Sequence, residues 1–114
     1  MKIEHNGTLI RVYVARSRRR ESTEVYRLVV EALAEAGIAG ATVFSGIEGF
    51  GRGRLISNAD SVDTFVDLPI LIEAVDEDCK IRAVMPKLES IVDHGLVTLE
   101  RLQTIVHRHG GDTR

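Results

Sequence analysis

Apolar side chains alternate with other residues over residues 8–16, and this spacing predicts a first β-strand with one face turned toward a core. Over residues 23–37 the apolar positions recur every three or four residues, which predicts an amphipathic helix that ends at Gly37. Residues 41–48 predict a second strand, whereas residues 68–75 are apolar nearly throughout, as an interior strand is. This part of the chain therefore predicts the order β-α-β-β.

The remainder of the chain predicts a second helix and a last strand. We expect Asp76 to cap the helix and Pro86 to kink it or divide it into two pieces, because a proline inside a helix costs about 3 kcal/mol. Residues 96–108 predict the last strand, with the alternation interrupted near Glu100. Residues 109–114 are expected to form a frayed tail.

The predicted order β-α-β-β-α-β is that of the ferredoxin-like fold, an α+β architecture in which two helices cover one face of an antiparallel four-stranded sheet. We expect a single domain over residues 1–114, with its core in residues 8–107 and a long connection over residues 49–67. Strand residues are apolar on both faces of this sheet, but two helices can cover only one face. The uncovered face predicts that copies of the chain assemble.

Composition narrows the classes of function. The net charge is −2, so the chain has no overall basic field of the kind that attracts nucleic acid. Cys79 is the only cysteine, which excludes an internal disulfide framework, fits a reducing compartment and predicts a buried thiol in the second helix. No signal-peptide pattern opens the sequence and no apolar run is long enough to span a bilayer, so we expect a cytoplasmic protein that does not insert into membranes.

The sequence GIEGFGRGR at residues 46–54 departs from this regular pattern. Glycine permits positive φ angles and close approach of the backbone, so successive N–H groups can form a nest that binds an anion. The two arginines of the stretch can add charge-assisted hydrogen bonds to such an anion. The alternative is a flexible hairpin extension in which the glycines serve only the geometry of the turn. The glycines are Gly46, Gly49, Gly51 and Gly53, and the arginines are Arg52 and Arg54.

The same stretch carries a resemblance to a known family. Residues 31–53, EALAEAGIAGATVFSGIEGFGRG, resemble the first helix, the second strand and the start of the mobile T-loop of PII signalling proteins. Residues 65–78 resemble the strand that follows this loop. The segments GIAGATVFSGIEGFG, LPILIEAVD and GLVTLERL are closer still to the uncharacterised PII-like family named domain of unknown function 190. The resemblance extends over residues 8–107.

The resemblance implies a homotrimer of ferredoxin-like domains that binds an adenine nucleotide in the clefts between subunits. It implies that the loop over residues 49–67 changes shape with the ligand and docks on a partner protein, which for PII proteins is often a membrane transporter or channel. PII proteins regulate and do not usually catalyse, so no catalytic residue and no cofactor beyond this nucleotide is expected. The residues that match the ligand cleft of the family are Gly49, Gly51 and Arg52 at the base of the loop, with Phe50 anchoring the turn, Thr42 and Gly46 beside them, and Leu68, Pro69 and Ile72 against the base or ribose.

Two departures from the family pattern bear on the ligand. PII proteins carry a second loop, Gly-Asp-Gly-Lys, that holds phosphate groups, whereas residues 92–102 read VDHGLVTLERL and lack the lysine and the paired glycines. PII proteins also end the last strand with Arg-x-Arg-x-Gly, and here only Arg108 remains as a candidate ligand contact. A ligand with little phosphate, such as AMP or a cyclic nucleotide, is therefore expected rather than ATP with magnesium.

Residues 16–20, RSRRR, place four arginines directly after the first strand. In acylphosphatases, which share the ferredoxin-like fold, an arginine in this connection binds the substrate phosphate, but the asparagine that accompanies it on the second strand is absent here. A small-phosphate hydrolase is one alternative function, and a solvated charged turn is the more conservative interpretation. A third interpretation is that Arg18 or Arg19 contacts a ligand phosphate in the subunit cleft.

His107 and His109 lie two residues apart and face the same side of an extended strand. With His5 or His94 they can form a zinc or copper site, as a resemblance to the CutA proteins implies, since these share the PII fold and are linked to divalent metals. Two histidines without a third ligand at a diagnostic spacing are weak evidence for a metal site. We therefore favour surface histidines and keep a CutA-like metal-binding trimer as an alternative.

Overall fold

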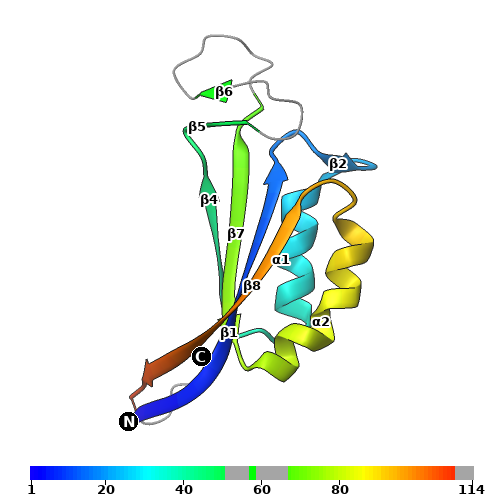
Figure 1. The fold of residues 1–114 in the computed structure, drawn as a ribbon. Coiled ribbons are helices and arrows are strands. Elements are labelled where there is room, and N and C mark those ends of the chain that lie inside the picture. The colour runs from blue at the N-terminus through cyan, green and yellow to red at the C-terminus, as the bar shows by residue number, and fades with distance from the viewer. Residues whose placement is uncertain (51–56, 59–66, 110–114) are drawn as a thin grey trace.

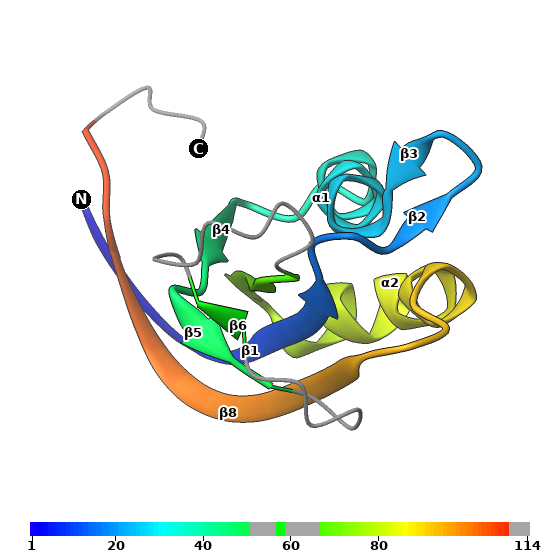
Figure 2. The same cartoon turned by 90° about the horizontal axis from the view of Figure 1, so that it is seen from above.

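A computed structural model describes residues 1–50, 57–58 and 67–109, which form a four-stranded antiparallel sheet with two helices against one face (Figures 1 and 2). The strand order in the sheet is β4-β7-β1-β8, so the predicted ferredoxin-like architecture is confirmed. No helix in this described part is long and apolar enough to cross a membrane. The sheet strands are β1 (Lys2–Ala15), β4 (Ala41–Ser45), β7 (Pro69–Asp76) and β8 (Leu96–His107), and the helices are α1 (Val25–Glu35) and α2 (Asp78–Ile91). β2 (Arg19–Arg20) and β3 (Thr23–Glu24) form a short hairpin, and β5 (Glu48–Gly49) pairs with β6 (Ser57–Asn58).

The core lies between the helices and the two central strands. β1 pairs with β7 on one side and with β8 on the other, so Ile10, Val12 and Val14 lie at the centre of the sheet and are almost completely buried. The apolar stripes of both helices cover them. Each fully buried Val, Leu or Ile side chain contributes about 1.5–3 kcal/mol to stability. The other core residues are Ile70, Ile72 and Ala74 of β7, Val25, Val29, Ala32 and Leu33 of α1, Ile38 after α1, and Ile81, Val84, Leu88 and Ile91 of α2.

β1 is longer than its alternation predicts and begins at Lys2 rather than at residue 8. Residues 2–7 pair with residues 102–107 of β8 in a ribbon that extends away from the helices toward the termini (Figure 1). In the described residues no helix covers this ribbon. Residues 2–7 contain one large apolar side chain, Ile3, so their sequence lacks the repeated apolar pattern that marks a core-facing strand. β8 keeps its register with β1 through Glu100, but its burial does not alternate over residues 97–101, so the predicted interruption of the alternation near Glu100 is confirmed.

The predicted end of α1 is confirmed, whereas the predicted division of α2 at Pro86 is wrong. At the end of α1, Gly37 has a φ of +78°, and the N–H group of Ile38 donates a hydrogen bond to the carbonyl oxygen of Leu33 at 3.1 Å. This is the predicted glycine stop, in which a left-handed residue lets the chain satisfy the last carbonyl groups. α2 is one continuous element with Pro86 inside it, so its division into two pieces is wrong. Packing of its apolar stripe offsets the lost backbone hydrogen bond, and the kink stays a prediction.

The start of α2 differs from its prediction in two respects. The N-cap residue is Glu77, without a side-chain capping bond, whereas the Asp76 carboxylate accepts hydrogen bonds from the N–H groups of Glu77 at 2.7 Å and Ala39 at 2.9 Å. Asp76 thus ties the start of α2 to the connection that precedes β4. Cys79 is exposed, so the predicted burial of its thiol is wrong; the buried stripe of α2 begins at Ile81 and leaves Cys79 on the solvent side.

Candidate functional site

The end of β4 and the start of β7 meet where the long connection leaves and rejoins the sheet. The N–H group of Gly46 donates a hydrogen bond to the carbonyl oxygen of Pro69 at 2.8 Å. A Cβ atom at Gly46 would lie 2.5 Å from Cγ of Pro69, and one at Gly49 would lie 3.1 Å from the same atom. The backbone therefore passes so close to the proline ring that glycine is needed at Gly46. The structure brings these three predicted site residues together.

The end of β1 closes the same region. The N–H group of Arg16 donates to the carbonyl oxygen of Leu68 at 2.9 Å. The N–H group and the hydroxyl of Ser17 donate to the two carboxylate oxygens of Asp67 at 3.0 and 2.7 Å. Nη2 of Arg16 donates to Oγ of Ser45 at 3.2 Å and so reaches β4. We call this group the loop base; it consists of Arg16, Ser17, Ser45, Gly46, Gly49, Asp67, Leu68 and Pro69.

The sequence predicted the glycines and the Leu-Pro pair of the loop base. It did not predict that Arg16, Ser17 and Asp67 would hold the loop base together by hydrogen bonds. A signal was present, because Asp67 directly precedes the strand that follows the long connection, where a side-chain acceptor commonly fixes a turn. Its donor could not be read from the sequence. Ser17 becomes that donor only because β1 and β7 are neighbours in the sheet, 50 residues apart in the chain.

Several other predicted site residues are placed differently. The side chain of Phe50 is 68% exposed, and its role as an anchor of the turn stays a prediction. Gly51 and Arg52 lie outside the described residues. Thr42 is exposed on β4. Ile72 is fully buried against the helices, so its predicted contact with a base or ribose is wrong.

Arg18 and Arg108 lie at opposite ends of the sheet. Arg18 follows Ser17 at the loop base and is exposed. The N–H group of Arg108 donates to the carbonyl oxygen of Met1 at 2.8 Å, beside the start of β1. The 14 residues of β1 separate these two ends by roughly 45 Å. Within one chain Arg108 therefore lies far from the loop base, and its Nε atom is buried without a hydrogen-bond partner in the described residues.

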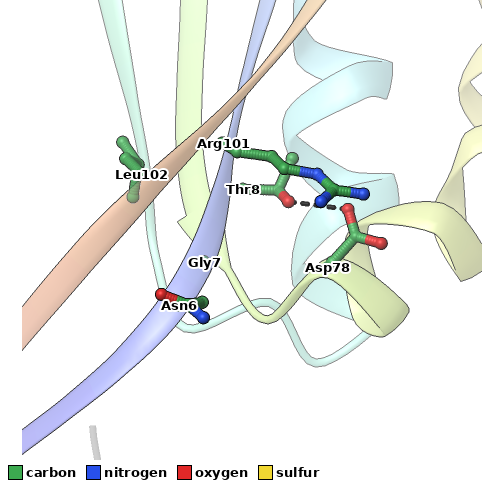
Figure 3. Close-up of a pocket in the computed structure, with 6 residues that line it drawn as sticks. All are labelled: Asn6, Gly7, Thr8, Asp78, Arg101 and Leu102. Atoms are coloured by element: carbon green, nitrogen blue, oxygen red, sulfur yellow. Dashed lines mark hydrogen bonds between the residues drawn. The ribbon is translucent and has the colours of Figure 1, made fainter.

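A separate hollow of about 470 Å³ lies among β1, β8 and the start of α2 (Figure 3). Thr8, which is 1% exposed, donates its hydroxyl hydrogen to Oδ1 of Asp78 at 2.7 Å, and Nε of Arg82 lies 3.4 Å from the same oxygen. The hydrogen bond from Thr8 is the main cause that lowers the pKa of Asp78, and the charges of Arg82 and Arg101 lower it further. The lining residues are Asn6, Gly7, Thr8, Asp78, Arg101 and Leu102.

This hollow is lined by Asn6, Gly7 and Leu102 of the ribbon and by Asp78 at the start of α2, so it is separate from the loop base (Figure 3). Its carboxylate is already bonded to Thr8 and Arg82 of the same chain. We interpret the contact as structural, because it joins the start of α2 to β1. Sequence reasoning did not identify it, since Thr8 and Asp78 are 70 residues apart and neither belongs to a recognisable motif.

The face of the sheet away from the helices carries a row of apolar side chains that crosses all four strands. Register partners place one member of the row on each strand. Three of the four side chains are exposed, by 38–57% of their surface. A continuous exposed apolar row of this kind marks an interaction surface. The row consists of Phe44 of β4, Leu71 of β7, Tyr13 of β1 and Leu96 of β8.

An ion pair lies on the same face, beside the apolar row. Nε of Arg11 donates to Oε2 of Glu73 at 2.8 Å, and Nη1 of Arg11 lies 3.5 Å from Oε2 of Glu100. The hydrogen bond to Glu73 is the main cause that raises the pKa of Arg11. Glu73 is thus engaged by a cation of its own chain, on the surface that the apolar row defines.

The histidines do not gather into a metal site in the described residues, where no three His, Cys, Asp or Glu side chains are grouped to hold an ion. Nε2 of His5 lies 2.9 Å from Oγ1 of Thr104 within the ribbon. His107 is the register partner of Lys2 at the far end of the same ribbon. The described residues therefore offer no group of metal ligands that would support the CutA-like alternative.

Solved PII-like proteins share this fold. The chain matches CPII, a nitrogen regulatory PII-like protein of Thiomonas intermedia K12 solved with ADP, AMP and bicarbonate, with a TM-score of 0.67 and 13% identity over 90% of this chain and 91% of CPII. It matches the PII-like signalling protein TTHA0516 of Thermus thermophilus with a TM-score of 0.60 and 16% identity over 90% and 91% of the two chains. These likenesses establish a PII-like fold.

Sequence comparison identifies the particular family. The model of the family described as DUF190, Uncharacterized ACR, matches residues 7–104, and the chain belongs to this family. The UPF0166 protein MJ1524 of Methanocaldococcus jannaschii is 35% identical over 106 residues, which are 92% of this chain and 94% of the relative. A UPF0166 protein of Aquifex aeolicus is 30% identical over 97 residues, 85% and 91% of the two chains. The predicted family membership is confirmed.

Proposed function

We propose that this chain is a PII-like regulatory protein that binds a small anionic ligand, an adenine nucleotide, in clefts between the subunits of a homotrimer. The connection over residues 49–67 reports the bound ligand to a partner protein, and the chain regulates rather than catalyses. The observation that carries this proposal is the loop base, where both ends of the connection are fastened to each other and to the end of β1. A ligand that contacts the loop base acts on both ends of the connection together.

The chemistry of the loop base suits a nucleotide. The missing side chains of Gly46 and Gly49 make room for the Pro69 ring, so the ring and the backbone at the two ends of the connection pack closely together. Leu68 and Pro69 are half-buried apolar residues beside them, and an apolar surface of this kind supports a base or ribose. The predicted contacts of Gly51 and Arg52 extend the same site along the connection.

The apolar row supports the homotrimer. Its aromatic and aliphatic side chains lie on the face that the helices leave open, and burial of apolar surface contributes roughly 25 cal/mol for each Å² removed from water. We propose that other copies of the chain cover this row. Every copy carries the same row, so the rows can pack together in a closed symmetric assembly. Arg108, at the far end of its own sheet, can then reach a loop base only from a neighbouring subunit.

The PII-like neighbours support the ligand class. CPII was solved with ADP, AMP and bicarbonate, and its fold is the fold of this chain. The loop base lies at the root of the connection that corresponds to the predicted T-loop. The partner that reads this connection is expected to be a protein, and the resemblance to PII proteins favours a membrane transporter or channel.

The test is a thermal-shift series on protein whose mass in solution has been determined. The ligands are AMP, ADP, ATP, cyclic AMP, inorganic phosphate and divalent metal ions. A ligand that binds only the folded state raises the melting temperature by mass action. At a hundredfold excess over Kd it adds about 2.7 kcal/mol to the free energy of unfolding. The proposal predicts a trimer stabilised by an adenine nucleotide and not by phosphate alone. A monomer, or a trimer that no nucleotide stabilises, contradicts it, and stabilisation by metal alone favours the CutA-like alternative.

A further inference from the structure

The arginines of the β2–β3 hairpin differ in their contacts. Arg19 is the register partner of Glu24, and its guanidinium lies 3.0 Å from the Glu24 carboxylate and donates to the carbonyl oxygen of Ser22 at 2.8 Å. Glu24 also lies 3.5 Å from Nε of Arg27 at the start of α1. The guanidinium of Arg19 is therefore already engaged by Glu24 and Ser22 within the hairpin.

Arg18 and Arg20 flank Arg19 and point to the opposite face, because successive side chains of an extended strand alternate. The extended pairing includes Arg18, whose carbonyl oxygen accepts a hydrogen bond from the N–H group of Val25 at 2.8 Å. Both arginines are exposed, and neither guanidinium has a hydrogen bond or ion pair in the part of the chain that the structure describes. Two like charges two residues apart on one face repel each other unless an anion binds between them.

The hairpin is joined to the loop base. Ser17, directly before Arg18, donates two hydrogen bonds to Asp67, the residue that precedes Leu68 and Pro69. The hairpin and the root of the connection therefore lie at the same end of the sheet, away from the termini (Figure 1), and the hairpin lies beside the start of α1 (Figure 2). Arg18 therefore follows a residue that is hydrogen-bonded to Asp67, the neighbour of Leu68 in the proposed wall for the base or ribose.

We infer that Arg18 and Arg20 form a phosphate-binding face on the hairpin, and that the nucleotide bound at the loop base supplies the phosphate. The inference rests on the proposed function for the source of that phosphate. Guanidinium groups bind phosphate through two parallel charge-assisted hydrogen bonds, so a pair of them suits a chain of two phosphates better than one. The hairpin thus supplies cations in place of the family's loop lysine, which residues 92–102 lack, and it makes a nucleoside diphosphate a better ligand than the monophosphate.

The test is isothermal titration of adenosine, AMP and ADP into the wild type, the double variant Arg18→Ala/Arg20→Ala, and two single variants. Arg20→Ala and Arg19→Ala each remove one positive charge from the same hairpin. Arg19→Ala is the control, because the Arg19 guanidinium is already engaged by Glu24 and Ser22. The double variant is expected to bind ADP roughly 10–100-fold more weakly, the effect of losing charge-assisted hydrogen bonds. Adenosine affinity stays unchanged, Arg20→Ala loses affinity for ADP in part, and Arg19→Ala binds ADP nearly as the wild type does.

The outcomes separate this inference from the proposed function. If the wild type and the double variant bind ADP with the same affinity, the inference is overturned and the proposed function stands. If the wild type binds no nucleotide, the proposed function fails, and a second arm measures pyrophosphate binding and sedimentation with vesicles of phosphatidylglycerol or of phosphatidylcholine. Binding of pyrophosphate or of the anionic vesicles that is lost only in the double variant supports a phosphate-binding face with another source of phosphate. Absence of both overturns the inference.

Discussion

The N–H group of Gly46 donates a hydrogen bond to the carbonyl oxygen of Pro69, and the two residues lie so close that a Cβ atom on Gly46 would come within 2.5 Å of the proline ring. This contact joins the end of β4 to the start of β7, the two points between which the long connection runs. The contact therefore fixes the root of the connection whatever conformation the connection itself adopts.

Substitution Gly46→Ala is expected to destabilise the fold by about 1–3 kcal/mol, because the proline ring is rigid and the new methyl group would overlap it. Gly49→Ala is the graded control, since its Cβ would lie 3.1 Å from the same ring atom and needs only a small shift. Urea unfolding of both variants measures the effect. Equal stability of the wild type and Gly46→Ala would show that the two strand ends are not held at this distance.

Asp67→Ala removes the acceptor for both hydrogen bonds from Ser17, and we expect the root of the connection to open locally without global unfolding. Hydrogen exchange of the Ser17 amide should become roughly tenfold faster, the effect of about one lost net hydrogen bond. Ser17→Ala is the matched control, because it removes the hydroxyl donor and keeps the backbone N–H bond. A fastening role is refuted if the Ser17 amide exchanges at the same rate in Asp67→Ala as in the wild type.

Phe44→Asp is expected to dissociate the proposed trimer, because it places a charge within the apolar row that the subunits bury. Ile47→Asp is the control, since Ile47 is also apolar and is 77% exposed but lies outside the row. Light scattering at micromolar protein concentration measures the mass of each variant. A trimer that survives Phe44→Asp would place the interface on another surface.

Asp78 is expected to make stability depend on pH. Its pKa is lowered in the folded chain, chiefly by the hydrogen bond from Thr8, so its contribution is fully present above the unfolded pKa of about 3.9 and is lost as pH falls through the lower folded value. The stability difference between the wild type and Asp78→Asn should therefore be largest near neutral pH and shrink below about pH 4.

The control for this prediction is Asp93→Asn, because Asp93 is exposed and makes no side-chain hydrogen bond in the described residues. Urea unfolding at a series of pH values measures both differences. The assignment to Asp78 fails if its variant loses the same stability at every pH, or if Asp93→Asn shows the same pH dependence.

The periodicity of the sequence predicted the helices and the central strands because their apolar residues face a core. It did not predict the ribbon, since residues 2–7 pair with β8 beyond the reach of the helices and carry no core-facing pattern. Cys79 was predicted to be buried from its residue type alone, although the stripe of α2 leaves its position on the solvent side.

The candidate site could be predicted only in part. Gly46, Gly49 and Pro69 were found from their residue types and from a family resemblance, and the structure explains the two glycines by their close approach to the proline ring. Two features were not predictable: the hydrogen bonds between Ser17 and Asp67, and the pairing of Arg19 with Glu24. Each depends on which residues face each other in the folded chain.

The central claim is that assembled copies of this chain bind an adenine nucleotide at the loop base. The most direct measurement is isothermal titration of ADP into wild-type protein whose mass has been determined by light scattering, with inorganic phosphate as the control ligand. The account predicts a trimer that binds one ADP per chain and has no comparable affinity for phosphate. A monomer, or a trimer that gives no heat of binding with ADP or AMP, would contradict it.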